Sequence, residues 1–144
     1  MYQRIIVPTD GSEISAKAAD AAVKLAKLCG AAISVISVKE PFPYSAISEM
    51  QPVPPQEFYD AQERIASDRV KAVLAAAQAA GVTADGATVE ALHPWEAILE
   101  HAKIKGADLI VMASHGRRGV AALLIGSETS RTLTHSSLPV LVIK

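Results

Sequence analysis

Short apolar runs alternate with longer helical patterns along this chain, and this alternation limits its fold more than any other feature. We expect five strands, at 4–8, 31–38, within 83–92 with ATVEAL (87–92) as its main stretch, 107–114 and 139–144. The stretches between them predict helices at 13–29, 56–80, 94–105 and 127–136. Such a β-α-β order implies a parallel sheet, because right-handed crossovers place the helices on its two faces. The sequence predicts one open α/β domain over residues 1–144, with helices on both faces of the sheet.

The expected helices carry end signals. Ser12 is placed to cap the first helix, and Gly30 to end it. Pro94 suits the first turn of the third helix, where its missing N–H costs nothing. The apolar spacings predict three buried stripes: Ile14, Ala18, Ala21, Leu25 and Leu28; Phe58, Ala61, Ile65, Val73 and Ala77; and Trp95, Ile98, Leu99 and Ala102.

Composition and charge exclude several classes of function. The net charge of −1 gives no overall field that would attract nucleic acid or anionic lipid. Cys29 is the only cysteine, so an intramolecular disulfide and a CxxC site are excluded. The four histidines have no metal-ligand spacing, and we expect no protein-only metal site. No secretory signal opens the chain, and no apolar run approaches the ~20 residues of a membrane span, so we expect a cytoplasmic protein.

Two of the segments that follow strands carry unusual chemistry. One is 8–12 (PTDGS) and the other is 113–119 (ASHGRRG). In open α/β sheets a ligand binds beyond the carboxyl ends of the strands, where the strand order reverses. If the first and fourth strands are neighbours at this point, both segments face one crevice. The strand order is then 3-2-1-4-5.

A helix that follows the second segment begins at Gly126 and Ser127. Free N–H groups at a helix N-terminus bind anions, and a glycine lets a ligand approach the backbone. Arg117 or Arg118 can add positive charge, and Asp10 can accept from ribose hydroxyls or hold a metal ion. The residues therefore suggest a phosphate site, although the chain has neither a GxxxxGK[ST] nor a GxGxxG motif.

At this point the sequence resembles the universal stress proteins over essentially its whole length. The resemblance rests on IIVPTDGSE near the start, the block VMASHGRRG…LLIGSETSRTLTHSS, and the ending PVLVIK. The nucleotide-binding branch of that family carries G-x2-G-x9-G-[ST]. Here Gly116, Gly126 and Ser127 match at the right spacing, and Ala113 replaces the first glycine. An added methyl group at Ala113 could crowd the sugar of a nucleotide.

The resemblance implies a nucleotide site at the ends of the first, second and fourth strands, with ATP, alone or with Mg²⁺, as its ligand. Near adenine and ribose, the site would contain Pro8, Thr9 and Asp10, and Val38 would bond to adenine through its backbone. The sugar and phosphates would lie along Met112, Ala113, His115, Gly116 and Arg117. The phosphate tail would be surrounded by Gly126, Ser127, Glu128 and Thr129. Glu128 would bring a carboxylate close to a polyanion, so it must point away or meet a metal ion.

The interpretation that follows is an ATP-binding regulatory protein of the stress response, with at most slow ATP hydrolysis. An alternative is a nucleotide-independent interaction module whose site is weakened by Ala113. A third is an enzyme of the same broad fold, for which the chain offers no further catalytic residues. The proline-rich segment 40–55 is either a lid over adenine or only a connection.

The last strand also predicts an assembly. Val140, Leu141, Val142 and Ile143 form an apolar edge strand, and such edges are usually covered. We expect a homodimer in which two copies of this strand pair antiparallel, an interface that the resemblance also implies. No partner of another kind can be named from the sequence.

Overall fold

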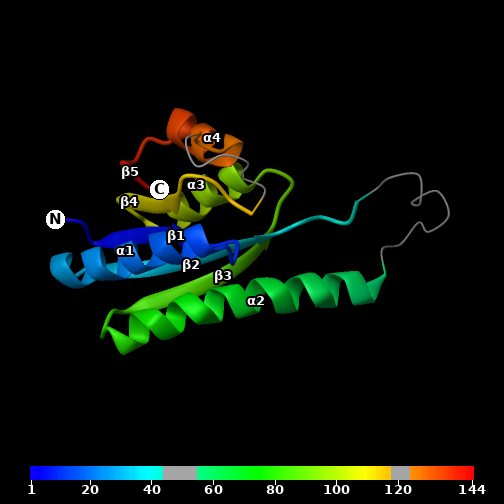
Figure 1. The fold of residues 1–144 in the computed structure, drawn as a ribbon, viewed down its shortest axis with the longest axis horizontal. Coiled ribbons are helices and arrows are strands. Elements are labelled where there is room, and N and C mark those ends of the chain that lie inside the picture. The colour runs from blue at the N-terminus through cyan, green and yellow to red at the C-terminus, as the bar shows by residue number, and fades with distance from the viewer. Residues whose placement is uncertain (44–54, 118–123) are drawn as a thin grey trace.

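A computed structural model describes residues 1–43, 55–117 and 124–144, and contains one five-stranded parallel sheet (Figure 1). The strands are β1 (Arg4–Pro8), β2 (Ala32–Lys39), β3 (Ala84–Glu90), β4 (Leu109–Ala113) and β5 (Val140–Ile143). The helices are α1 (Glu13–Cys29), α2 (Gln56–Ala79), α3 (Pro94–Lys105) and α4 (Ser127–His135). The order β3-β2-β1-β4-β5 confirms the predicted topology.

The sheet is covered on both faces. α1 and α2 pack on one face, against side chains such as Val7, Val35 and Val111. α3 packs on the other face, against Ile6 and Ile110, and α4 lies beside α3 (Figure 1). The central strands are therefore buried on both sides, which explains why they are apolar runs rather than alternating patterns.

The predicted ends of α1 are confirmed, and so is part of its predicted stripe: Ala18 is buried and Leu25 packs against the core, whereas the last residue of the stripe is not buried. Ser12 Oγ accepts from the Ser15 N–H at 3.2 Å, and Gly30 ends the helix with φ of 70°. Leu28, expected inside, is 86% exposed. The buried residues of α1 are mostly small: Ser15, Ala18, Ala19, Ala22, Val23 and Ala26. A helix rich in alanine has more than one moderately apolar face, so spacing alone does not fix its orientation.

The predicted stripe of α2 differs from the structure at Ile65. α2 extends beyond the sheet at its N-terminal end (Figure 1), but Glu63 already accepts from Thr88 Oγ1 of β3 at 3.0 Å, so the helix is beside the sheet before it reaches Ile65. Ile65, expected inside, is 41% exposed. The buried face begins at Ala66 and continues through Val70, Val73 and Ala77.

β3 lies within the predicted region 83–92, but it begins at Ala84, before the stretch 87–92 that was expected to form most of it. Asp85 and Gly86 are weak strand formers, but pairing with β2 from Ile33 onward holds them extended. A glycine is needed here because α2 approaches closely. A Cβ on Gly86 would lie 2.3 Å from Val70 Cγ1.

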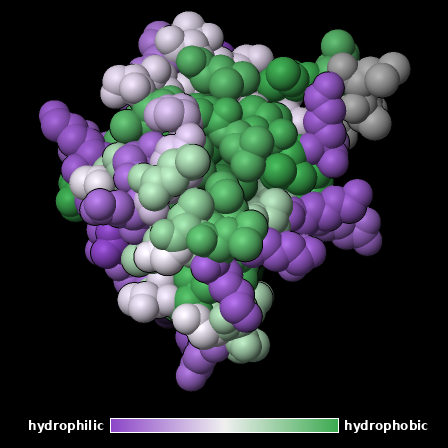
Figure 2. All heavy atoms as spheres, turned by 90° about the vertical axis from the view of Figure 1, so that its left-hand side faces the viewer, coloured by the Kyte–Doolittle hydropathy of each residue, from purple (hydrophilic) through white to green (hydrophobic). Residues whose placement is uncertain are grey.

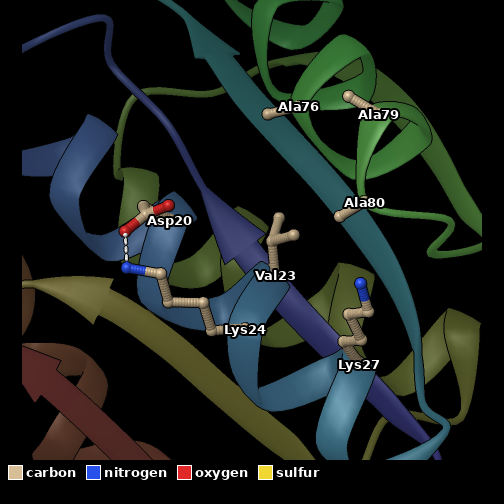
Figure 3. Close-up of a pocket in the computed structure, with 7 residues that line it drawn as sticks. All are labelled: Asp20, Val23, Lys24, Lys27, Ala76, Ala79 and Ala80. Atoms are coloured by element: carbon tan, nitrogen blue, oxygen red, sulfur yellow. Dashed lines mark ion pairs between the residues drawn. The ribbon is translucent and has the colours of Figure 1, made fainter.

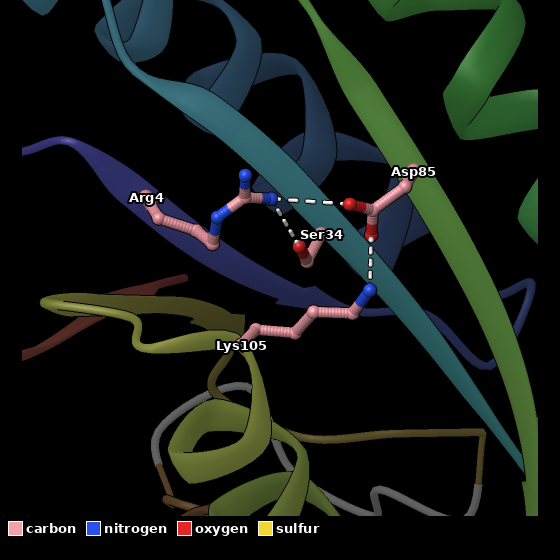
Figure 4. A network of polar contacts seen from close by, with 4 residues as sticks. All are labelled: Arg4, Ser34, Asp85 and Lys105. Atoms are coloured by element: carbon pink, nitrogen blue, oxygen red, sulfur yellow. Dashed lines mark hydrogen bonds and ion pairs between the residues drawn. The ribbon is translucent and has the colours of Figure 1, made fainter.

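A polar network joins three strands to the end of α3 (Figure 4). Arg4 Nη1 donates to Ser34 Oγ at 2.9 Å and pairs with Asp85 Oδ2 at 3.1 Å. Lys105 Nζ lies 3.5 Å from Asp85 Oδ1. The charged side chains are partly exposed, so each ion pair contributes no more than about 1 kcal/mol. The network links the starts of β1 and β3 across β2.

His101 lies close to this network and is 6% exposed. Its Nε2 has no hydrogen-bond partner within the described ranges. Burial lowers the pKa of His101, and the charge of Lys105 lowers it further, while Asp85 raises it. The folded protein therefore favours the neutral imidazole.

A pH dependence of stability follows from His101. With its folded pKa below the ordinary value of about 6.5, the unfolded chain binds the proton more readily. The stability from neutral His101 is complete above that value and decreases as the pH falls below it, by at most about 1.4 kcal/mol per pH unit for one proton. Urea unfolding at pH 7.5, 6.5 and 5.5 measures this slope. His101→Leu is expected to flatten it, and the exposed-site control His93→Leu to keep it. Equal slopes in both variants would contradict this account.

The end of the sheet where the strands begin is apolar on its surface. Figure 2 views the molecule from that side and shows a band of hydrophobic residues beside hydrophilic ones. Leu28 and Ile104, in the last turns of α1 and α3, are 86% and 70% exposed. In the described part of the chain, no helix has the length and apolarity needed to cross a bilayer.

Candidate ligand-binding crevice

The loops after β1 and β4 meet at Asp10. Asp10 Oδ1 accepts from the Ser12 N–H at 3.0 Å and from Ser12 Oγ at 2.6 Å. Its other oxygen, Oδ2, accepts from the Arg117 N–H at 2.8 Å. Asp10 therefore shapes its own turn and also ties the two loops together. The sequence predicted that these loops share one crevice, and this bond brings them into contact.

The bonds to Asp10 fix its charge. Burial alone would raise the pKa of this carboxyl group. The hydrogen bonds from Ser12, the Arg117 N–H and Ser15 together outweigh burial and lower the pKa below its ordinary value. Asp10 is therefore a carboxylate throughout the physiological range, and a weak base.

The two glycines of the second loop allow close packing of the protein itself. A Cβ on Gly116 would lie 2.6 Å from Asp10 Oδ2. A Cβ on Gly126 would lie 3.2 Å from the Cα of His115. Glycine at both positions lets the loop after β4 fold back against the β1 loop and against the start of α4.

The start of α4 is held to the end of β4. The Gly126 N–H donates to the Ser114 carbonyl at 2.7 Å, and Thr129 Oγ1 donates to the Ala113 carbonyl at 2.8 Å. Thr129 is only 3% exposed, so its hydroxyl serves this anchor. The N-cap residue of α4 is Gly126, which has no side chain to cap the helix. The first N–H groups of the helix, at Ser127 and the next residues, have no acceptor within the helix and point out of its N-terminus.

Glu128 points away from this N-terminus. Its Oε2 accepts from the Trp95 N–H at 2.9 Å, and Oε1 lies 3.7 Å from Arg131 Nη1. Glu128 thus supplies α3 with an acceptor for a first-turn N–H. Trp95, expected in the core, instead stacks on His135 at the α3–α4 contact, with ring centroids 4.6 Å apart. The carboxylate therefore does not oppose an anion at α4.

The methyl group of Ala113 lies largely inside the protein. Ala113 is 9% exposed. Alternation along β4 places it on the same side as Leu109 and Val111, whose side chains belong to the core under α1 and α2. A methyl group in this position takes little space from the crevice.

Within the described residues, no strand pairs with the backbone of Val38 on the side of β1. The β1–β2 ladder ends at Pro8 and Ile36, and the Thr9 N–H donates to the Ile36 carbonyl. Even-numbered residues of β2 direct their N–H and C=O toward β1, as the Ala32 bond to Gln3 also shows. Val38 is also even-numbered, and it comes two residues after Ile36, the last residue of β2 that pairs with β1. Its N–H and C=O face the space above the end of β1.

The other predicted residues are either buried beneath these loops or exposed beside them. Met112 and Thr9 are 5% and 7% exposed, and Thr9 Oγ1 lies 3.4 Å from Ser15 Oγ. His115 is partly exposed, with Nδ1 3.2 Å from Ser114 Oγ. Arg117 is exposed at the rim. Arg118 and most of the predicted lid, 40–55, lie outside the described residues.

The sequence analysis missed Arg69. This residue is on α2, and its side chain reaches the loop after β1: a Cβ on Gly11 would lie 3.0 Å from Arg69 Nε. Gly11 has φ of 79°, a conformation that favours glycine. The Asp-Gly turn was visible in the sequence, but nothing there indicated which helix would pack against it.

A hollow of about 360 Å³ lies between α1 and α2 (Figure 3). It is lined by alanines of α2 and by Asp20, Val23, Lys24 and Lys27 of α1, with Lys24 Nζ paired to Asp20 Oδ2 at 2.8 Å. The lining lies toward the C-terminal ends of both helices, and therefore at the end of the sheet away from Asp10. The two lysines of the hollow lie on the exposed surface of α1. The hollow has no glycine-bearing loop and no helix N-terminus among its lining residues.

Comparison with known proteins identifies one family for the whole chain. The model of the Universal stress protein family matches residues 1–144. The chain is 31% identical to Universal stress protein MJ0531 of Methanocaldococcus jannaschii, over all of this chain and 83% of that one.

Solved structures of similar proteins have the same fold as this chain. The structure of protein MJ0577, also from Methanocaldococcus jannaschii, superposes with a TM-score of 0.85 at 26% identity, covering 100% of this chain and 96% of that one. A universal stress protein solved in complex with cAMP superposes with a TM-score of 0.75 at 25% identity, covering 99% and 97%.

Proposed function

Since the chain belongs to the universal stress protein family, we propose that it is a stress-response regulatory protein that binds ATP, alone or with Mg²⁺, in the crevice between the β1 and β4 loops. The observation that carries the proposal is the open start of α4. The N-cap residue, Gly126, supplies no side-chain cap, and Glu128, the acidic residue of the first turn, is turned toward Trp95. Its N–H groups and its positive dipole end are therefore available to phosphate oxygens.

The opposite end of the crevice suits adenine. The open N–H and C=O of Val38 form a donor–acceptor pair, which matches the edge of an adenine ring. Asp10 lies between Val38 and α4 in this arrangement, where a ribose hydroxyl can donate to its carboxylate. The covered methyl group of Ala113 supports the same proposal, because it leaves room for the sugar. The solved relative with cAMP shows that a protein of similar fold holds an adenine nucleotide.

Nucleotide acts in this proposal as a ligand and not as a substrate. Asp10 accepts three hydrogen bonds from the protein, and its lowered pKa makes it a poor general base. Any hydrolysis is expected to be slow. The bound state changes the conformation of the loops after β1 and β4, and with it the affinity for a cytoplasmic partner.

The proposal is tested by the nucleotide that the purified protein carries. Heat denaturation should release an adenine nucleotide in a defined ratio to protein, which chromatography and mass spectrometry identify. Asp10→Ala is expected to lower that ratio at least tenfold, and Asp20→Ala, at an exposed position of α1 away from Asp10, to leave it unchanged. The interaction-module alternative predicts no nucleotide in any of the three proteins, and that result would contradict ATP binding.

The dimer belongs to the same proposal. β5 pairs only with β4, so its other edge is open within the described sheet, and Leu141 is 41% exposed. An antiparallel pairing of two β5 strands, Val140–Ile143, would cover both edges. Sedimentation at micromolar concentration is expected to give twice the chain mass. A strictly monomeric mass would overturn the dimer and leave nucleotide binding untouched.

A further inference from the structure

The N-terminus of α3 is capped by a side chain of another helix. Its own N-cap residue, His93, makes no side-chain cap bond, and Pro94 has no N–H to donate. The Trp95 N–H is therefore the first of the helix that needs an acceptor, and Glu128 Oε2 of α4 supplies it at 2.9 Å. Glu128 is also the acidic residue of the first turn of α4. One carboxylate thus lies within reach of the starts of two helices.

Without the Trp95 N–H, the carboxylate of Glu128 has a second favourable position. A carboxylate in the first turn of a helix is attracted by the free N–H groups and by the positive dipole end of that helix. α4 offers both, because its N-cap residue is Gly126. The other contact of Glu128, from Oε1 to Arg131 Nη1 at 3.7 Å, joins side chains that are 37% and 52% exposed, and it holds the carboxylate only weakly. A released Glu128 would therefore turn toward the start of α4.

That turn would oppose nucleotide in two ways, because the proposed function places the phosphates at the start of α4. The charge of Glu128 would lie beside a polyanion and repel it. The N–H groups of the first turn would also have an acceptor from the protein itself. In the structure the Trp95 N–H prevents both effects.

Trp95 holds α3 against α4 at a second point. Its ring stacks on His135, with centroids 4.6 Å apart and planes 20° from parallel. Residues 128 and 135 are seven positions apart and so share one face of α4. The backbone and the ring of Trp95 therefore fix the N-terminus of α3 along two turns of α4. Leu92, in the segment that leads into α3, is 73% exposed, so this segment can be reached from outside.

We infer that Trp95 is a positioning residue, whose backbone N–H holds the Glu128 carboxylate away from the phosphate site. Displacement of the N-terminus of α3 then makes Glu128 an internal inhibitor of nucleotide binding. This inference rests on the proposed function and adds a mode of regulation to the same site.

Two substitutions of Glu128 test the inference without altering α3. Glu128→Asp keeps the charge in the first turn of α4 but draws the carboxylate back from the Trp95 N–H. Glu128→Gln keeps the reach and removes the charge. Calorimetry on nucleotide-free protein is expected to show that the Gln variant binds ATP about tenfold more tightly than the Asp variant. Glu96→Gln removes an exposed carboxylate from the first turn of α3 and should bind ATP as the wild type does.

A second pair of variants removes the donor itself. Trp95→Pro deletes the N–H in the first turn of α3, where proline is tolerated, whereas Trp95→Ala keeps the N–H and removes only the ring. Trp95→Pro is expected to bind ATP about tenfold more weakly than Trp95→Ala. Glu128→Gln in the Trp95→Pro background should recover most of this loss, a rescue that general damage to α3 would not give.

The outcomes separate this inference from the proposed function. If the wild-type chain binds ATP but the two Glu128 variants bind it equally, or Glu128→Gln gives no rescue, Trp95 does not position Glu128 and nucleotide binding still stands. If the wild-type chain binds no ATP, both proposals fail. A thermal melt verifies that each variant is folded. Should Trp95→Pro unfold, the comparison of the two Glu128 variants decides.

Discussion

Gly116→Val is expected to lower the affinity for ATP at least a hundredfold, about 2.7 kcal/mol or more in binding free energy. Any Cβ at this position would lie 2.6 Å from Asp10 Oδ2, the oxygen that accepts from the Arg117 N–H. The carboxylate must move, and the bond that ties the β1 and β4 loops together is lost. The branched side chain also enters the crevice itself. Calorimetry on the folded variant measures the loss.

A double-mutant cycle checks the cause. The stability cost of Gly116→Ala, which adds only the Cβ, should fall by more than half in an Asp10→Ala background, because the clashing oxygen is gone. Independent, additive costs would show that the close approach to Asp10 is not what requires glycine. ATP affinity of Gly116→Val within threefold of wild type would contradict the role of this loop in binding.

The largest effect on stability is expected at Gly86. A Cβ there would lie 2.3 Å from Val70 Cγ1 and 3.3 Å from Leu74 Cδ1, in the contact between β3 and α2. Gly86→Val should therefore destabilise the protein toward the upper end of the roughly 1–3 kcal/mol typical of overpacking. The expected result is a large fall in the urea midpoint with an unchanged slope.

A compensating variant gives the control. Val70→Ala removes the clashing methyl group, so the pair Gly86→Ala and Val70→Ala should be more stable than the sum of the two single changes predicts. A Gly86→Val protein as stable as wild type would show that α2 moves away from β3 without cost. The measurement therefore tests the packing of α2, which also positions Arg69.

The topology was predictable because its signals are local. The ends of α1 follow from Ser12 and Gly30, and the crevice follows from the unusual segments after β1 and β4. The order of the strands then follows from placing those two segments side by side. Each step uses residues that are close in sequence, or a rule that holds for parallel sheets in general.

The details that failed depend on contacts between distant residues. The buried face of α1 was predicted only in part because alanines lie on several of its faces: Ala18 and Leu25 were placed correctly, but Leu28 was wrongly placed inside. The start of β3 was missed because pairing with β2 overrides the low strand propensity of Gly86. The direction of Glu128 depends on Trp95, 33 positions away, and that of Arg69 on the β1 loop.

The central claim is that this crevice binds ATP although Ala113 stands where the nucleotide-binding pattern has glycine. Calorimetric titration of ATP with Mg²⁺ into nucleotide-free wild-type protein tests it most directly. The account predicts saturable binding in the micromolar range, because Ala113 is only 9% exposed and strand alternation places its methyl group on the side of the core under α1 and α2. No binding up to millimolar ATP, by protein with an intact fold, would contradict it.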